Sequence, residues 1–378
     1  MFRVKTLMVF ALVAALALFS SMLTSGLADG GANHRVRNLH FGVSGGNVND
    51  ASSRFCCSGT LGSLVTFGST QYILSNNHVL GRSGAASVGD DVSQPGLIDN
   101  NCRIATVVAD FTAAAPLGSS NVDAAVAQLR PGQMDSSGFI EDIGVPSSTI
   151  VNPSVGLSVA KSGRTTGFTT GTVSSINTSV SIQYQQGCNQ GKKFTVSYTN
   201  QVVINSSTFS AGGDSGSLIV TNNGNHNPVA LLFAGSSTTT IGNPIGAVLT
   251  QIGAVLGGTV TFNGVASNGN GRHVKGLDED GNMGAGGRQP FTPGIQSLMP
   301  QLPQQAADRV SAVLENHRAN LMFQPGVMGV GVGLSNRAEG EGAIVIYVNK
   351  DAGNKPFLPD SIEGVPVNVI LTDQFVAF

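Results

Sequence analysis

The stretch FSAGGDSGSLIV, residues 209–220, decides the fold of this chain. It places Ser215 inside the pentapeptide GDSGS, directly before the apolar run 218–220. A serine hydroxyl is a weak nucleophile at neutral pH, and it becomes reactive only beside a base, with hydrogen-bond donors aimed at the developing oxyanion. The glycine before Asp214 permits a tight turn, in which the amides of Gly213 and Ser215 can point into one small cavity. The stretch therefore predicts a nucleophilic serine.

A nucleophilic serine needs an imidazole as its base, and His78 is the candidate among the six histidines. It follows the β-rich run 71–74 and the polar residues 75–77, at the end of a predicted strand. The other histidines lie in the N-terminal tail, a loop, a glycine-rich linker and a helical segment, where we expect packed or solvated side chains: His34, His40, His226, His273 and His317.

A carboxylate must orient that imidazole, and Asp123 is the preferred candidate. It enters the small, apolar strand 124–127, which suits a buried aspartate that holds one histidine tautomer. The rivals are Asp90, Asp91, Asp99 and Asp110. Asp90 and Asp91 lie in a turn-like GDD, and Asp110 ends an apolar run, where we expect a solvated or capping role.

The order of the three residues along the chain separates the classes of serine hydrolase. The order here is histidine, aspartate, serine, which is that of chymotrypsin-type enzymes, whereas subtilisins and α/β-hydrolases follow other orders. The nucleophile-elbow pattern G-x-S-x-G also fails, because residue 217 is serine. The sequence therefore favours the chymotrypsin type.

With these motifs in place, the chain resembles the trypsin-like (chymotrypsin-fold) serine proteases, especially the bacterial branch that includes α-lytic protease and the streptogrisins. The resemblance covers about residues 40–256 and rests on four motifs: LSNNHVLG at 74–81, VDAAVA at 122–127, KSGRTTGFTTGTV at 161–173 and GGDSGSLIV at 212–220. It implies a double six-stranded β-barrel. It also implies that His78 is the general base, Asp123 its orienter and Ser215 the nucleophile, with the Gly213 and Ser215 amides as the oxyanion hole.

The resemblance further implies a supporting ion pair. Bacterial relatives place a basic residue ahead of S-G-x-T-T-G and pair it with the aspartate before the nucleophile, which here gives Lys161 with Asp214. The alternative is that Lys161 is a surface lysine at a strand end.

The substrate pocket is predicted to be neutral or apolar. Trypsin-like enzymes that cleave after Arg and Lys carry an aspartate six residues before the nucleophile, and Phe209 stands there. The strand LLFAGSS resembles the one that lines the cleft in that family, and it contributes the neutral Phe233, Ala234 and Gly235. An unpaired cation in such a pocket would be costly to desolvate.

Four cysteines follow the N-terminal segment, and their even number in an exported chain suggests disulfides. Cys56 and Cys57 are adjacent and are poor partners for each other, so we expect one to pair with Cys102 and the other with Cys188. The spacing does not suggest a metal site, and we expect neither a metal nor another cofactor.

The two ends of the chain carry further signals. Residues 1–28 have a charged start, a short apolar stretch and small residues before Ala28, as expected for a signal peptide and a secreted or periplasmic protein; a retained anchor is the alternative. The chain has a formal net charge of −2 and no basic stripe, which argues against nucleic acid as a partner. No stable membrane anchor is expected.

Composition supports a mainly β protein. Only 11% of the residues are charged, and 50 glycines punctuate short Val/Ile/Thr runs, which is typical of an all-β barrel or sandwich. We place the protease domain at 40–258 and a Gly/Asn-rich linker at 259–294.

Residues 295–378 are predicted to form a small α+β module. A helix is expected over about 304–322, with a buried stripe at Val310, Val313, Leu314, His317 and Leu321. Strands are expected over 327–334, 343–348 and 366–371. The unit resembles a module that often precedes such proteases. It could contact the protease domain as an inhibitor, foldase or substrate-recruiting unit, or it could be a neutral accessory domain.

The favoured function is a secreted serine endopeptidase that acts on polypeptides through an acyl-enzyme. Two alternatives stay open. One is a protease-fold binding protein without turnover, and the other is an esterase that uses the same residues.

Overall fold

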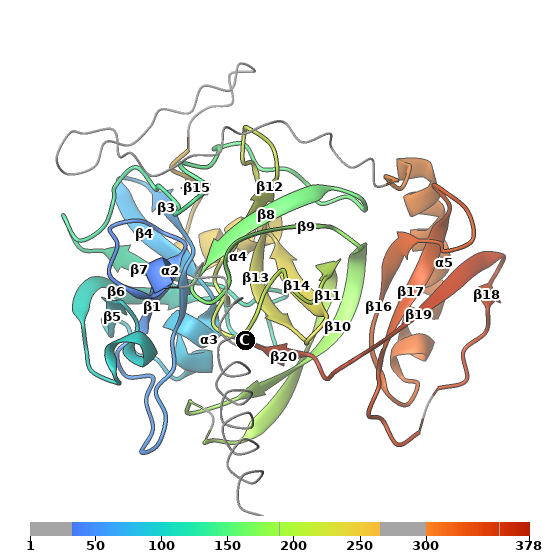
Figure 1. Cartoon of the computed structure of the whole chain (residues 1–378), viewed down its shortest axis with the longest axis horizontal. Coiled ribbons are helices and arrows are strands. Elements are labelled where there is room, and N and C mark those ends of the chain that lie inside the picture. The colour runs from blue at the N-terminus through green and yellow to red at the C-terminus, as the bar shows by residue number, and fades with distance from the viewer. Residues whose placement is uncertain (1–31, 189, 265–299, 355) are drawn as a thin grey trace, which may run out of the picture.

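The computed structural model describes residues 32–188, 190–264, 300–354 and 356–378, and its elements are shown in Figure 1. The predicted signal peptide 1–28 and residues 265–294 of the predicted linker lie outside the described residues. The fold is mainly β, of the chymotrypsin double-barrel type, followed by a small α/β region.

The first barrel is built on one sheet of eight strands in the described part of the chain. Their order is β15-β3-β4-β7-β6-β5-β1-β2. Their bounds are β1 Val43–Asn47, β2 Gly59–Leu61, β3 Ser63–Phe67, β4 Thr70–Ser75, β5 Asp91–Gln94, β6 Thr106–Ala114, β7 Ala125–Leu129 and β15 Val260–Phe262. Strand β15 pairs with β3, so this sheet extends past residue 258, where the protease domain was predicted to end.

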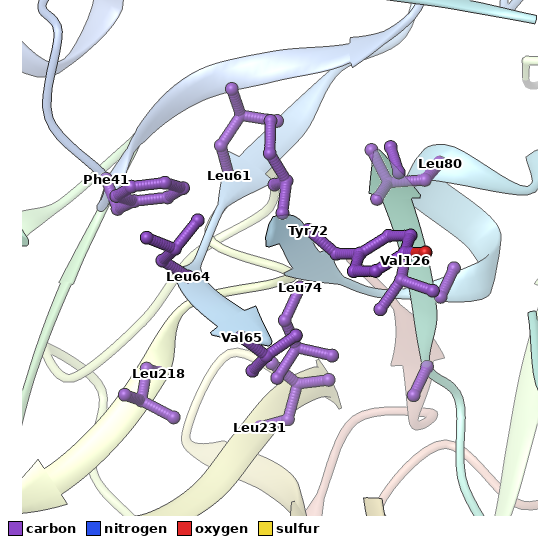
Figure 2. Packing of buried hydrophobic residues seen from close by; sticks show 14 of the residues in the cluster. Phe41, Leu61, Leu64, Val65, Tyr72, Leu74, Leu80, Val126, Leu218 and Leu231 are labelled. Carbon is purple, nitrogen blue, oxygen red and sulfur yellow. The ribbon is translucent and has the colours of Figure 1, made fainter. Parts of the chain in front are cut away.

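Alternating apolar residues of these strands form the barrel core, as the period of two along a strand requires. Figure 2 shows Leu64, Tyr72 and Leu74 among the buried side chains that converge between the strands. Leu218 and Leu231 join the same cluster from the second sheet, so the two barrels share one continuous apolar contact.

The second sheet contains twelve strands in the described residues, and seven of them come from the protease part of the chain. These seven are β8 Ser158–Gly163, β9 Gly167–Thr172, β10 Ser175–Gln185, β11 Lys193–Asn205, β12 Leu218–Thr221, β13 Pro228–Gly235 and β14 Thr239–Pro244. The protease part also contains the helical segments α2 Ala32–Arg35, α3 Asn77–Leu80, η1 Arg82–Gly84, η2 Leu97–Asn100 and α4 Ile245–Leu256.

The C-terminal region agrees closely with its prediction. Helix α5 spans Gln304–Met322, and the strands are β16 Val327–Leu334, β17 Gly342–Asn349, β18 Ser361–Ile362, β19 Val365–Thr372 and β20 Val376–Ala377. The helix packs on β16 and β17 through Val310, Leu314 and Leu321. His317 does not belong to the buried stripe: it is 34% exposed and contacts Glu363 at 2.7 Å.

This region is joined edge to edge to the second barrel. Strand β16 pairs antiparallel with β10, so the sheet runs without a break from the barrel into the C-terminal region, visible at the right of Figure 1. Arg318 of α5 adds hydrogen bonds to the carbonyl and side chain of Asn177 and to Ser179. Tyr347 donates or accepts a 2.9 Å hydrogen bond with Ser175.

Two disulfides settle the pairing that the sequence left open. Cys56 pairs with Cys102, and Cys57 pairs with Cys188. The expectation of one partner each is confirmed, and the second bridge ties the first barrel to the β10–β11 hairpin of the second. None of the helices in the described ranges is long and apolar enough to cross a membrane.

Candidate active site

Strand ends bring His78 and Asp123 together. His78 lies on the short helix α3, which starts two residues after β4 ends, and Asp123 lies two residues before β7. Because β4 and β7 are antiparallel neighbours, the segment after β4 and the segment before β7 meet at one edge of the sheet. Nδ1 of His78 lies 2.6 Å from Oδ2 of Asp123, and the His78 amide donates to Oδ1 at 3.2 Å.

Asp123 is fully buried, and its surroundings hold it in place. Its backbone amide donates to Oδ1 of Asn243, and its carbonyl accepts from Nδ2 of Asn76. The phenol of Tyr184 donates to Oδ2 at 2.9 Å and lies 2.7 Å from the phenol of Tyr198. A buried carboxylate needs such donors, because an unpaired one would be costly to keep ionised.

The surroundings of His78 shift the pKa of its imidazole. Burial lowers the pKa of His78, but the Asp123 carboxylate, the hydrogen bond to Phe378 and the charge of Asp50 together raise it above its usual 6.5. Burial also raises the pKa of Asp50 to about 6. The surroundings of His78 therefore keep its imidazole more basic than a free one.

Ser215 lies in the turn before β12 and is fully buried. Its Oγ donates to the carbonyl oxygen of Phe233 at 3.2 Å, while Nε2 of His78 lies 2.9 Å from the carbonyl oxygen of Phe378. Among the described residues, the structure therefore joins His78 to Asp123 but shows no hydrogen bond between His78 and Ser215.

The turn around Ser215 uses backbone conformations with positive φ that only glycine adopts readily. Gly213 and Gly216 have φ angles of +97° and +96°, which L-residues with a side chain rarely adopt. A Cβ atom at Gly216 would meet the Thr60 carbonyl oxygen at 2.2 Å. Within the described residues, the amides of Gly213 and Ser215 take part in no hydrogen bond, so both remain available as donors to an oxyanion.

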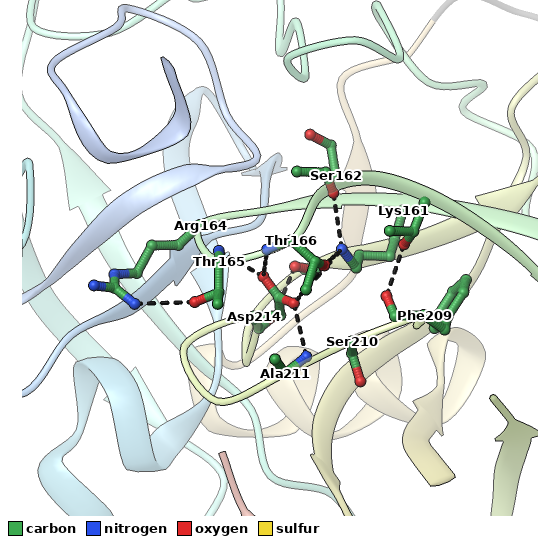
Figure 3. A network of polar contacts seen from close by, with 12 residues as sticks. Lys161, Ser162, Arg164, Thr165, Thr166, Phe209, Ser210, Ala211 and Asp214 are labelled. Atoms are coloured by element: carbon green, nitrogen blue, oxygen red, sulfur yellow. Dashed lines mark hydrogen bonds and ion pairs between the residues drawn. The ribbon is translucent and has the colours of Figure 1, made fainter. Parts of the chain in front are cut away.

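Asp214 is fully buried and belongs to a polar network, drawn in Figure 3. Its Oδ1 accepts from the amides of Thr165 and Thr166, and its Oδ2 accepts from the Ala211 amide and the Thr166 hydroxyl. Nζ of Lys161 lies 3.6 Å from Oδ2.

Lys161 is itself fully buried, which excludes the alternative of a surface lysine. Its ammonium donates to the carbonyl of Gly167 at 2.8 Å and to the Thr166 hydroxyl. Burial lowers the pKa of Lys161 to about 8, against the attraction of Asp214. This network joins the loop after β8 to the Ser215 turn and restrains both.

The four residues predicted to form the pocket come from two elements. Phe233, Ala234 and Gly235 end strand β13, and Phe209 lies under β9, where a Cβ on Gly171 would touch its ring at 2.8 Å. An open cleft of about 480 Å³ lies beside them and is lined by His78, Gly213, Tyr184 and the Cys57–Cys188 bridge, among others. The four pocket residues do not line this open volume.

Two features of the site were missed by the sequence reasoning. Tyr184 belongs to an alternating strand pattern, which predicts an inward ring but not its contact with Asp123. Phe378 lies 300 residues from His78, and no motif marks it.

As to metals, the described residues contain no group of three or more His, Cys, Asp or Glu that could hold an ion.

Comparisons with known proteins agree with the fold. The model of Peptidase family S64 matches residues 73–236. No curated protein matches the sequence.

Three solved structures are similar to parts of this chain. A glutamic acid-specific serine protease has 20% identity and a TM-score of 0.40, over 59% of this chain and 98% of its own. Thermobifida fusca protease A has 17% identity and a TM-score of 0.38, over 59% and 98%. The α-lytic protease homolog N4 has 20% identity and a TM-score of 0.38, over 60% and 98%. The two barrels and the peptidase family match together identify a serine protease fold of the chymotrypsin type.

Proposed function

We propose that this chain is an exported serine endopeptidase that uses His78, Asp123 and Ser215. The observation that carries the proposal is the buried contact of 2.6 Å between Nδ1 of His78 and Asp123. This contact fixes the proton on Nδ1 and leaves Nε2, on an imidazole that lines the cleft, as the proposed base.

In the proposed reaction, Ser215 Oγ attacks the carbonyl carbon of the scissile peptide as His78 takes its proton. The amides of Gly213 and Ser215 would donate to the oxyanion, and His78 would return the proton to the leaving amine. Water then attacks the acyl-enzyme in the same way, with His78 again taking the proton, and this step releases the new carboxylate and frees Ser215. Preorganised donors of this kind contribute about 2.7–4 kcal/mol each to such reactions.

Export is supported by the two disulfides, because disulfides persist in oxidising compartments and are rare in cytosolic proteins. The predicted signal peptide agrees with this localisation. Polypeptides are the proposed substrates, with a neutral or apolar residue before the cleaved bond.

The proposal is tested by prolonged exposure of the purified protein to a fluorophosphonate probe, followed by mass spectrometry of the labelled peptide. We expect covalent label on Ser215, and none on the Ser215→Ala or His78→Ala variants. A folded wild-type protein that stays unlabelled, under conditions that label a control protease, overturns the proposal. Release of new amino termini from a denatured protein substrate separates a peptidase from an esterase.

A further inference from the structure

The last three described residues of the chain, Val376–Phe378, lie in the cleft next to His78 and Ser215. Strand β20 reaches the centre of the molecule from the C-terminal region, as the red segment in Figure 1 shows. It pairs antiparallel with β13 on one side, through Ala377 opposite Ala234 and Val376 opposite Gly235. On the other side, Val376 pairs with Gln183 of β10.

This pairing aligns the backbone of the tail with the proposed catalytic groups. The Phe378 amide donates to the carbonyl of Phe233 at 3.4 Å, and Ser215 Oγ donates to the same carbonyl. The Phe378 carbonyl oxygen lies 2.9 Å from Nε2 of His78. The backbone pairing of Val376–Phe378 with β13 is thus that expected of residues on the acyl side of a cleaved bond, with the Phe378 carbonyl oxygen on His78 rather than on the amides of Gly213 and Ser215.

The side chain of Phe378 fills the predicted pocket. A Cβ atom at Gly235 would meet its ring at 2.6 Å, so this glycine leaves the room that the ring uses. The ring packs against the apolar cluster that includes Phe209, Leu232 and Ile219. This contact accounts for the cover over Gly235, whereas Phe233 is buried against the ring of Tyr198.

The tail is anchored before it enters the cleft. Thr372 lies 2.6 Å from the Ser236 hydroxyl and 2.9 Å from the Thr238 hydroxyl, at the turn after β13. Phe375 is fully buried, and its carbonyl accepts from the Gln183 amide at 3.0 Å. Because the anchors lie within a few residues of Phe378, the tail re-enters the cleft at a high effective concentration.

We propose that the cleft selects peptides with an aromatic residue on the acyl side and a small residue before it, and that the segment Val376–Phe378 occupies the cleft as an internal competitor of such substrates. The inference rests on the proposed peptidase function. It names the substrate class of that site, and it accounts for the position of Phe378 beside His78.

The first experiment compares the rate of fluorophosphonate labelling of Ser215 in the full chain, a chain that ends at Phe375, Phe378→Ala and Phe323→Ala. Phe323 is the matched control, because it is also in the C-terminal region but is 90% exposed. We expect the shortened chain to be labelled about ten- to a hundredfold faster, from the apolar area that Phe378 buries. Phe378→Ala should be intermediate and Phe323→Ala unchanged.

The second experiment uses the shortened chain and peptides that end in a reporter amide. We expect Val-Ala-Phe-reporter to be cleaved about tenfold or more faster than Val-Ala-Arg-reporter. The free peptide Gln-Phe-Val-Ala-Phe should inhibit competitively, and Gln-Phe-Val-Ala-Arg should not.

The outcomes separate the two proposals. If no form is labelled, the peptidase function fails. Three other outcomes overturn the tail proposal and leave the peptidase proposal intact. They are equal labelling rates in all forms, equal effects of Phe323→Ala and Phe378→Ala, and a preference for arginine over phenylalanine. Thermal unfolding of each variant checks folding, and Phe378→Ala carries the test if the shortened chain does not fold.

Discussion

The phenol of Tyr184 donates a 2.9 Å hydrogen bond to Oδ2 of Asp123, the same oxygen that contacts His78. Tyr184 lies on β10, the strand of the second barrel to which the C-terminal region is joined. The carboxylate of the first barrel is therefore positioned by a side chain of the second. The contact makes the geometry of His78 depend on how the two barrels pack.

Replacing Tyr184 by phenylalanine removes this donor and keeps the ring. A hydrogen bond to a charged group is worth about 1.5–3 kcal/mol, so we expect a loss of that size in the free energy of unfolding. We also expect about tenfold lower kcat/KM, because Asp123 and His78 would be less firmly oriented.

Tyr347→Phe is the matched control for that variant. It removes a buried hydrogen bond to Ser175, which involves neither Asp123 nor His78. It should lower stability by about 1 kcal/mol and leave the pH profile of kcat/KM unchanged. Equal losses of kcat/KM in both variants would show that Tyr184 acts only on stability.

Lys161→Met should destabilise the protein and slow the reaction together. The substitution leaves the Asp214 carboxylate buried without its cation, which costs about 3–5 kcal/mol when one partner of a buried pair is removed. Because Asp214 holds the turn of Gly213 and Ser215, we expect kcat to fall more than KM rises.

Urea unfolding and steady-state kinetics measure the two effects. Lys192→Met, at an exposed position, serves as the control and should match the wild type. An active and fully stable Lys161→Met protein would contradict the supporting role of the pair.

The pH dependence follows from the raised pKa of His78. Only neutral His78 can act as base, so kcat/KM should rise with pH through a midpoint above 6.5. Asp50→Asn removes one of the charges that raise this pKa, so the midpoint should move to lower pH. Asp142→Asn alters the distant His34 instead and should leave the midpoint unchanged.

The same shift has a consequence for stability, with a definite sign. A histidine whose pKa is higher in the folded state contributes stability below its unfolded pKa, and this contribution is lost as pH rises through the folded pKa. The difference in the free energy of unfolding between the wild type and His78→Gln, followed between pH 5 and 9, should show this loss, because Lys161, with its pKa of about 8, titrates in both proteins. A contribution that instead grows with pH would contradict the direction.

The two disulfides should differ in their effect on stability. Cys57–Cys188 closes a separation of 131 residues, against 46 for Cys56–Cys102. In the chain-entropy model, this difference makes the longer bridge about 1 kcal/mol more stabilising, within a total of about 2–5 kcal/mol per bridge. Serine replacement of each pair, followed by denaturant unfolding, gives the comparison. A larger loss from the shorter bridge would contradict that model here.

Local patterns predicted local structure well. The apolar spacing of residues 310–321 predicted α5, because helix periodicity acts over a few residues. His317 fitted the spacing but lies at the exposed margin of the stripe, where Glu363 binds it.

Contacts between distant segments could not be predicted in this way. The choice between Cys56 and Cys57 depends on which of two neighbours faces the β10–β11 hairpin, and this is set by barrel packing. The approach of Phe378 to His78 depends on a docking of β16 against β10 that leaves no signal in either strand alone.

The junction of β10 with β16 has a consequence for solubility. An edge strand presents unpaired N–H and C=O groups to any other chain, and proteins usually block such edges. Here Val327–Leu334 covers the outer edge of β10 over residues 175–180. A protein shortened before residue 300 would expose this edge, and it should assemble through strand pairing into dimers or fibrils even if its barrels fold correctly.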